Sequence, residues 1–82
     1  MKREQIIAEL ERLARLLGIE VRYERMGVLA GGLCRIEDTL FIFINISLSQ
    51  KSRIDLLASE LRNFHWDDHF VVPEVRRIIE NR

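Results

Sequence analysis

A chain of 82 residues is long enough for one domain and too short for two, which indicates a single domain over residues 1–82. Apolar residues make up 48% of the chain and charged residues 32%, a balance that is typical of a folded globular protein and excludes a disordered one. The 13 basic residues equal the 13 acidic ones, so no broad positive field attracts nucleic acid or an anionic membrane, and neither is expected as a partner.

Cysteine content and charge placement predict a cytoplasmic protein. The one cysteine, Cys34, cannot form a disulfide within the chain, which suits a reducing compartment. Glu9, Glu11 and Arg12 interrupt the segment in which a secretion signal would need an apolar core. The longest apolar run, residues 40–44, is far shorter than the roughly 20 residues that a membrane helix requires.

The first predicted element is a helix over residues 3–17, because apolar residues recur at helical spacing. The apolar stripe consists of Ile6, Leu10, Leu13 and Leu17. Gly18 follows at the position where a left-handed residue often ends a helix.

Three strands are predicted next. Residues 19–24 alternate between apolar and charged side chains, as in a strand with one exposed face, and residues 32–36 and 40–46 are joined by a polar turn of hairpin length. The strand 40–46 is apolar on both faces. It is therefore expected to lie inside the sheet and be covered on both sides, or to expose the face that carries Phe41 and Phe43.

Two helices complete the predicted fold. Ser47 or Ser49 can cap the first of them, and Ser47 has Gln50 at the spacing of a capping box. Its buried stripe is predicted to consist of Ile54, Leu57, Ala58, Leu61 and Phe64. A loop is predicted at residues 65–69, and Pro73 suits the first turn of a short final helix.

These elements predict an α+β fold of order α-β-β-β-α-α. Strands that follow one another through short connections are usually neighbours in a sheet. The expected sheet is therefore small, three-stranded and antiparallel, with the helices packed mainly on one face.

The order of motifs in residues 31–61 resembles a known enzyme core. The letters GGLCR, a strand ending near Asn45 and a serine-capped helix with LASEL follow one another. This order is similar to the core of compact bacterial zinc metallopeptidases, in which a strand precedes a helix of pattern AHELxH. The resemblance places Ser59 and Asn63 at the two histidine positions and Glu60 at the general-base position.

A second resemblance covers most of the chain. GGLCR and a proline-led C-terminal helix are similar to those of a family of small uncharacterised bacterial proteins, a resemblance that implies no activity.

The zinc-peptidase resemblance lacks the metal ligands. Serine and asparagine are poor zinc ligands, so the helix that carries LASEL is not expected to hold zinc by itself. Without metal-bound water Glu60 has nothing to deprotonate and is interpreted as a surface residue, so no catalytic residue and no cofactor are predicted.

Residues 65–69 contain the one cluster with metal-ligand chemistry, which we call the His65–His69 cluster. Its members are His65, Asp67, Asp68 and His69. Imidazoles and carboxylates bind zinc or nickel if the loop folds back on itself. The simpler interpretation is a packed loop around Trp66 with polar groups on its rim.

Cys34 has a structural and a chemical interpretation. It lies on the strand face of Ile36, where a buried, unreactive thiol is expected, since cysteine is among the most buried residue types. A nucleophilic thiol would need a base and an electropositive, partly open setting.

Two hypotheses for function follow. The first is a non-catalytic binding or assembly module that uses Phe41 and Phe43 to contact a second copy of itself, as a homodimer, or another protein. The alternative is a metal-dependent hydrolase with an atypical ligand set around Glu60 and the His65–His69 cluster. The incomplete catalytic set favours the first, a protein that is not an enzyme.

Overall fold

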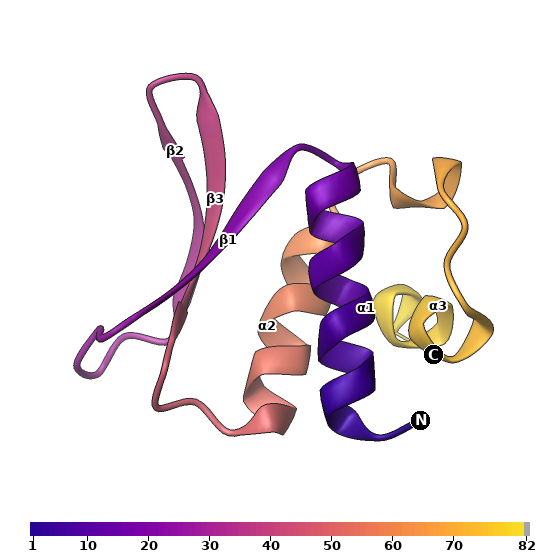
Figure 1. The fold of residues 1–82 in the computed structure, drawn as a ribbon, viewed down its shortest axis with the longest axis horizontal. Coiled ribbons are helices and arrows are strands. Elements are labelled where there is room, and N and C mark those ends of the chain that lie inside the picture. The colour runs from indigo at the N-terminus through magenta and orange to yellow at the C-terminus, as the bar shows by residue number, and fades with distance from the viewer. Residues whose placement is uncertain (82) are drawn as a thin grey trace.

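The computed structural model describes residues 1–81 (Figure 1). In chain order its elements are α1 (Arg3–Leu16), β1 (Ile19–Glu24), β2 (Gly31–Ile36), β3 (Thr39–Asn45), α2 (Gln50–Leu61), a 3-10 helix (Trp66–Asp68) and α3 (Pro73–Glu80). The predicted α+β class, with three α-helices and a three-stranded sheet, is confirmed. The 3-10 helix forms within the segment that was predicted to be a loop.

The sheet is mixed, so the prediction of an antiparallel sheet is wrong. Its strand order is β1-β3-β2, with β3 antiparallel to β2 and parallel to β1. The predicted hairpin of β2 and β3 is present, but β1 and β2 are not neighbours. Residues 25–30 connect them past the end of β3, a distance of two strand spacings of about 4.8 Å each. A short hairpin turn cannot span that distance, whereas six residues can.

The side chains of β3 explain why this strand is the central one. Ile42 and Ile44 are completely buried on one face, and Phe41 and Phe43 are half-buried on the other. A strand with apolar groups on both faces gains most from a neighbour on each side. β1 and β2 suit the edges better, because β1 carries charged residues on one face and β2 is largely exposed.

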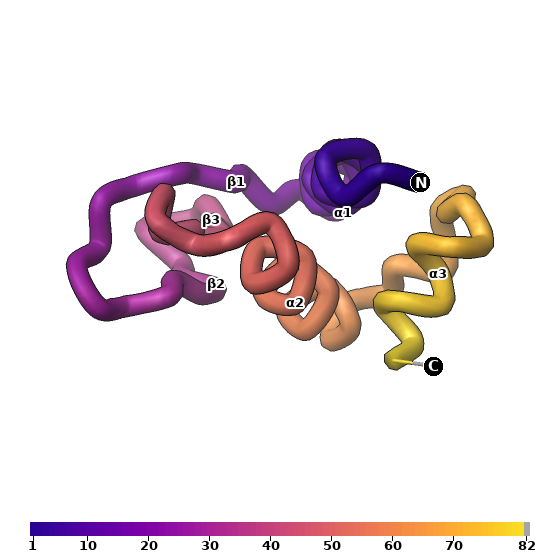
Figure 2. Tube along the Cα trace, turned by 90° about the horizontal axis from the view of Figure 1, so that it is seen from below, coloured from indigo at the N-terminus to yellow at the C-terminus, as the bar shows by residue number. Residues whose placement is uncertain are grey.

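The helices form two layers on one side of the sheet (Figures 1 and 2). α1 and α2 lie side by side against the sheet, and α3 packs on their far side. No helix lies over the opposite face of the sheet within residues 1–81. We call this opposite face the outer face. None of the helices in the described part of the chain is long and apolar enough to cross a membrane.

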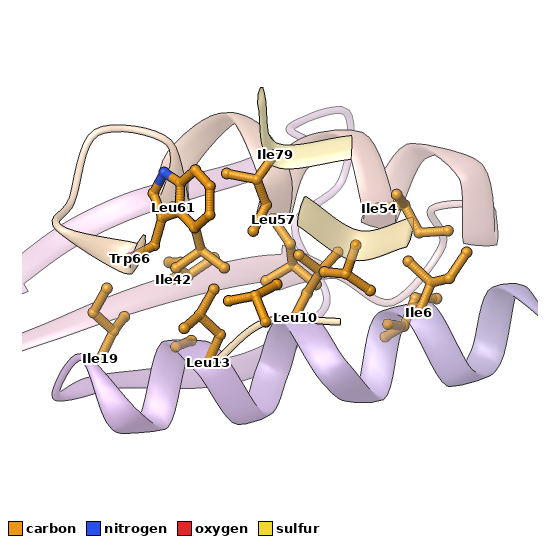
Figure 3. Close-up of a cluster of buried hydrophobic side chains, with 14 of the residues drawn as sticks. Ile6, Leu10, Leu13, Ile19, Ile42, Ile54, Leu57, Leu61, Trp66 and Ile79 are labelled. Atoms are coloured by element: carbon orange, nitrogen blue, oxygen red, sulfur yellow. The ribbon is translucent and has the colours of Figure 1, made fainter. Parts of the chain in front are cut away.

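The hydrophobic core lies between the sheet, α1, α2 and α3 (Figure 3). The predicted stripes are largely confirmed by the buried residues Ile6, Leu10, Leu13, Ile54, Leu57, Ala58 and Leu61. Leu17 and Phe64, at the ends of these stripes, are partly buried. Trp66 joins the core from the 3-10 helix, which explains why the segment after α2 folds back onto the helices.

Local signals at the helix ends agree with the structure in most cases. Gly18 follows α1 with a φ of +79°, and Pro73 is the first residue of α3. Ser49, one of the two candidates, caps α2 by accepting a hydrogen bond from the Ser52 backbone at 3.2 Å. The other candidate, Ser47, instead donates its backbone N–H to the side chain of Asn45 at 3.1 Å.

Candidate functional site

The outer face carries an aromatic pair at its centre. The rings of Phe41 and Phe43 are stacked with centroids 5.5 Å apart and an angle of 23° between their planes. Side chains alternate along β3, so these rings point away from the helices that bury Ile42 and Ile44. Both rings are only half-buried, because no other element of residues 1–81 covers them.

A charged row on β1 borders one side of the aromatic pair. The register places Glu20 beside Phe41 and Arg22 beside Phe43. Arg22 lies between two carboxylates, 3.5 Å from Glu20 and 3.9 Å from Glu24. These exposed groups pair with one another within the strand, which makes this border hydrophilic without giving it a strong local field.

β2 forms the other border of the aromatic pair. Cys34 lies beside Phe41 and Gly32 beside Phe43, and Ile36 ends the row with 48% of its surface exposed. The prediction of a buried thiol is wrong, because Cys34 is exposed. Cys34 shares the face of Ile36 as expected, but that face is the outer face and no helix covers it.

The residues that align with the zinc-peptidase pattern bind backbone groups. The Glu60 carboxylate accepts a hydrogen bond from the backbone N–H of Leu33 at 2.6 Å. The Ser59 hydroxyl donates to the carbonyl of Leu56 at 3.0 Å, and the Asn63 amide donates to the carbonyl of Ser59 at 3.4 Å. Glu60 therefore links α2 to the free edge of β2, a contact that the sequence alone did not indicate.

The His65–His69 cluster is spread around the 3-10 helix. His65, Asp67 and Asp68 are exposed and His69 is half-buried. Within residues 1–81, no three His, Cys, Asp or Glu side chains converge as ligands for a metal ion. The buried residue of this segment is Trp66, whose ring centroid lies 5.1 Å from the guanidinium carbon of Arg76. The arrangement matches the packed-loop interpretation of this segment.

An open hollow of about 410 Å³ lies between α2 and α3. Its lining residues are Asp55, Ala58, Ser59, Arg62, Ile78 and Asn81. The two charged groups in it already have partners. Lys51 binds Asp55 at 3.0 Å, and the Arg62 guanidinium donates to carbonyl oxygens at the end of α3. Arg62 therefore joins α2 to α3, whereas the ion pair of Asp55 lies within α2.

A second polar cluster joins α1, β1 and α2. The Tyr23 hydroxyl donates a hydrogen bond to the Glu11 carboxylate, and the guanidinium carbon of Arg53 lies 5.4 Å from the Tyr23 ring centroid. Burial is the largest of three effects that raise the pKa of Tyr23 from 10.0 to about 12, and the other two are the hydrogen bond to Glu11 and the negative charge of Glu11. The positive charge of Arg53 lowers the pKa of Tyr23 and so acts against them. The cluster of Glu11, Tyr23 and Arg53 therefore connects α1, β1 and α2 through polar contacts.

Because the chain has a single tyrosine, the ionisation of Tyr23 can be followed without interference from other tyrosines. We expect ultraviolet absorbance to show Tyr23 ionising near pH 12 in the folded protein and near pH 10 in urea. Because the folded state keeps a proton that the unfolded chain releases, the stabilisation is complete below pH 10 and is lost as the pH rises toward 12. Tyr23→Phe should remove this part of the loss of stability at high pH. If Tyr23 in the folded protein ionised with a midpoint near pH 10, the buried hydrogen bond between Tyr23 and Glu11 would be contradicted.

Comparisons with protein-family models, curated proteins and solved structures find no match to this chain. Both resemblances noted in the sequence therefore remain hypotheses. The outer face of the sheet is a surface that no helix of residues 1–81 covers and that carries the aromatic pair.

Proposed function

We propose that this protein is a non-catalytic binding and assembly module that forms a homodimer through the outer face of its sheet. The observation that carries the proposal is the stacked pair of Phe41 and Phe43 on a sheet face that no helix covers. Aromatic residues that lie side by side on an uncovered face are typical of interaction surfaces, and these two are half-buried there. A second copy offers the same pair, and symmetric dimers are the commonest assemblies of soluble proteins.

The composition of the outer face supports a second copy of the chain as its partner. The aromatic pair is bordered by Glu20, Arg22 and Glu24 on one side and by Cys34 and Ile36 on the other. The charged row on β1 gives this apolar centre a polar border on one side, and an apolar centre with a polar rim is the usual anatomy of an interface. The chain has equal numbers of acidic and basic residues, so two copies approach without net repulsion.

Light scattering at micromolar concentration should give about twice the chain mass of 9.7 kDa. Phe43→Asp should return the protein to a monomer, because the new carboxylate would be buried without a partner in the interface. Phe70→Asp is the matched control. Phe70 is 76% exposed and lies in the segment before α3, on the side of the helices away from the sheet.

The expected pattern is a dimer for the parent and for Phe70→Asp, and a monomer for Phe43→Asp. Circular dichroism should show the same fold in all three, because position 43 points away from the core. A parent that stays monomeric throughout the micromolar range would refute the proposal. A Phe70→Asp monomer would instead place the contact at the segment before α3.

A further inference from the structure

β2 is an edge strand with backbone groups that face outward. It pairs with β3 on one side only. Pairs in an antiparallel ladder alternate between hydrogen-bonded and non-hydrogen-bonded, and the two-residue turn makes Ile36 and Thr39 a hydrogen-bonded pair. Gly31, Leu33 and Arg35 therefore direct their N–H and C=O groups to the free edge. The hydrogen bond from the Leu33 N–H to Glu60 agrees with this assignment.

We propose that a second copy of this chain pairs with this edge, β2 against β2 in antiparallel orientation, with Cys34 of each copy at the two-fold axis. In this register Leu33 lies opposite Arg35 of the second copy, and Gly32 lies opposite Ile36 of the second copy. The contact joins two three-stranded sheets into one of six strands. It is separate from the contact between outer faces.

Charge complementarity selects this register. Arg35 is exposed, and within residues 1–81 its guanidinium forms no hydrogen bond or ion pair, although its backbone carbonyl accepts a contact from the Cys34 thiol. It points to the helix side of the sheet, as does Leu33, beside which the Glu60 carboxylate lies. When the carbonyl of the second copy's Arg35 accepts the Leu33 N–H, the carboxylate of Glu60 is released next to the guanidinium of that same residue. Because the pair of copies is symmetric, the ion pair between Glu60 and Arg35 forms twice, once on each side of the two-fold axis.

Apolar surface on the outer face supports the same register. Ile36 is 48% exposed on this face. The register places the second copy's Ile36 opposite Gly32, which lies beside Phe43. Apolar surface of both copies is thereby removed from water.

The fold leaves space for this approach. The tip of the β2–β3 hairpin projects beyond the ends of α1 and α2 (Figure 1), and Arg35, close to this tip in the sequence, is exposed. α2 reaches β2 near its own C-terminal end, through Glu60. In the symmetric pair the second copy's α2 lies beneath the projecting hairpin tip, and the two helices approach each other end to end.

The register has a covalent readout at Cys34. In the proposed pair the two copies of Cys34 form a non-hydrogen-bonded pair, whose Cα atoms are about 4.5 Å apart and within the range that a disulfide bridges. The test adds glutathione disulfide to the full chain. Two thiols lose two protons and two electrons to form one intermolecular disulfide, and glutathione disulfide is reduced to two molecules of glutathione.

We expect the Cys34 cross-link to form at least about tenfold faster than a cross-link at an equally exposed position outside the pair. The control is the double variant Cys34→Ser/Asp38→Cys, which moves the thiol to the exposed hairpin turn. Non-reducing electrophoresis follows the rate in both. Equal rates would show only random collision and would overturn the proposal.

Charge exchange separates this contact from the one between outer faces. Arg35→Glu and Glu60→Arg should each slow the cross-link at least about tenfold, because each places like charges opposite one another. The double variant Arg35→Glu/Glu60→Arg should recover the parent rate. Position 35 lies on the helix side, so a cross-link that arose from the outer faces would be insensitive to these changes. Unchanged rates in the single variants, or no recovery in the double variant, would refute the edge contact while leaving the outer-face dimer unaffected.

Discussion

Gly31→Ala is expected to destabilise the protein strongly. A Cβ atom at this position would lie 2.0 Å from the carbonyl oxygen of Phe43 and 3.1 Å from the Cα atom of Ile44. Both contacts are with backbone, so no side-chain rotation relieves them. The φ of +127° adds strain for any residue that has a side chain. β2 would have to separate from β3 at the start of their ladder.

The expected loss in the free energy of unfolding is about 3–5 kcal/mol, from backbone strain and overpacking together. A chain of 82 residues has about 4–12 kcal/mol in total, so this loss is a large fraction of the stability and approaches all of it at the lower end of that range. Urea unfolding followed by the fluorescence of the buried Trp66 measures it.

Gly27→Ala is the matched control for this substitution. Gly27 also has a positive φ, +58°, but a Cβ atom there would meet nothing within 4 Å. Its expected cost is about 1 kcal/mol, from the left-handed conformation alone. If Gly31→Ala were no more destabilising than Gly27→Ala, the close approach of β2 to β3 would be absent in solution.

The helices could be predicted from the sequence because their stabilising contacts are periodic. Leu10 and Leu13 on α1 and Leu57 and Leu61 on α2 recur at helical spacing, and all four are buried. The final helix followed from the proline at its start, since Pro73 is favoured in a first turn. Each of these signals is local, and no tertiary contact contradicts it.

The sheet order could not be predicted, because the usual preference for sequential neighbours acts against it. β1 and β2 are separated by six residues, a length that also fits an ordinary loop between neighbouring strands. One feature of the sequence did point to β3 as an interior strand, because it is apolar on both faces. The strand also ends in Asn45, a polar residue in an otherwise apolar run. Only the structure shows what Asn45 binds.

The candidate site was predicted in part. Phe41 and Phe43 followed from the apolar pattern on both faces of β3, and the structure shows that their face is the one no helix covers. The contact between Glu60 and the Leu33 N–H could not be predicted, because it joins residues 27 positions apart and depends on the strand order. The exposure of Cys34 depends on the same order, since it follows from which face the helices cover.

Asn45→Asp is expected to be the most damaging single change among the polar residues, although it alters the volume of the side chain very little. Asn45 is 3% exposed, and its amide nitrogen donates to the carbonyls of Gly27 at 3.0 Å and Leu29 at 2.7 Å. These two bonds hold the connection from β1 to β2 in its path past the end of β3. In the variant a carboxylate oxygen would face two carbonyl oxygens with no hydrogen between them.

The expected loss at neutral pH is about 3–5 kcal/mol, because a buried charge that keeps only the hydrogen bond from the Ser47 N–H replaces an amide that donates two hydrogen bonds. Asn45→Ala, the matched control, should cost less, since it leaves the carbonyls of Gly27 and Leu29 unpaired but buries no charge.

The pH dependence of the stability distinguishes the two variants. The buried carboxyl of Asn45→Asp holds a proton more tightly in the folded than in the unfolded chain, so its pKa is raised and its stability should recover as the pH falls. Urea unfolding at about pH 7 and about pH 5 should therefore show the difference between Asn45→Asp and the parent narrowing, while the difference for Asn45→Ala stays constant. Equal losses for both variants at both pH values would mean that the amide of Asn45 does not hold the crossing segment.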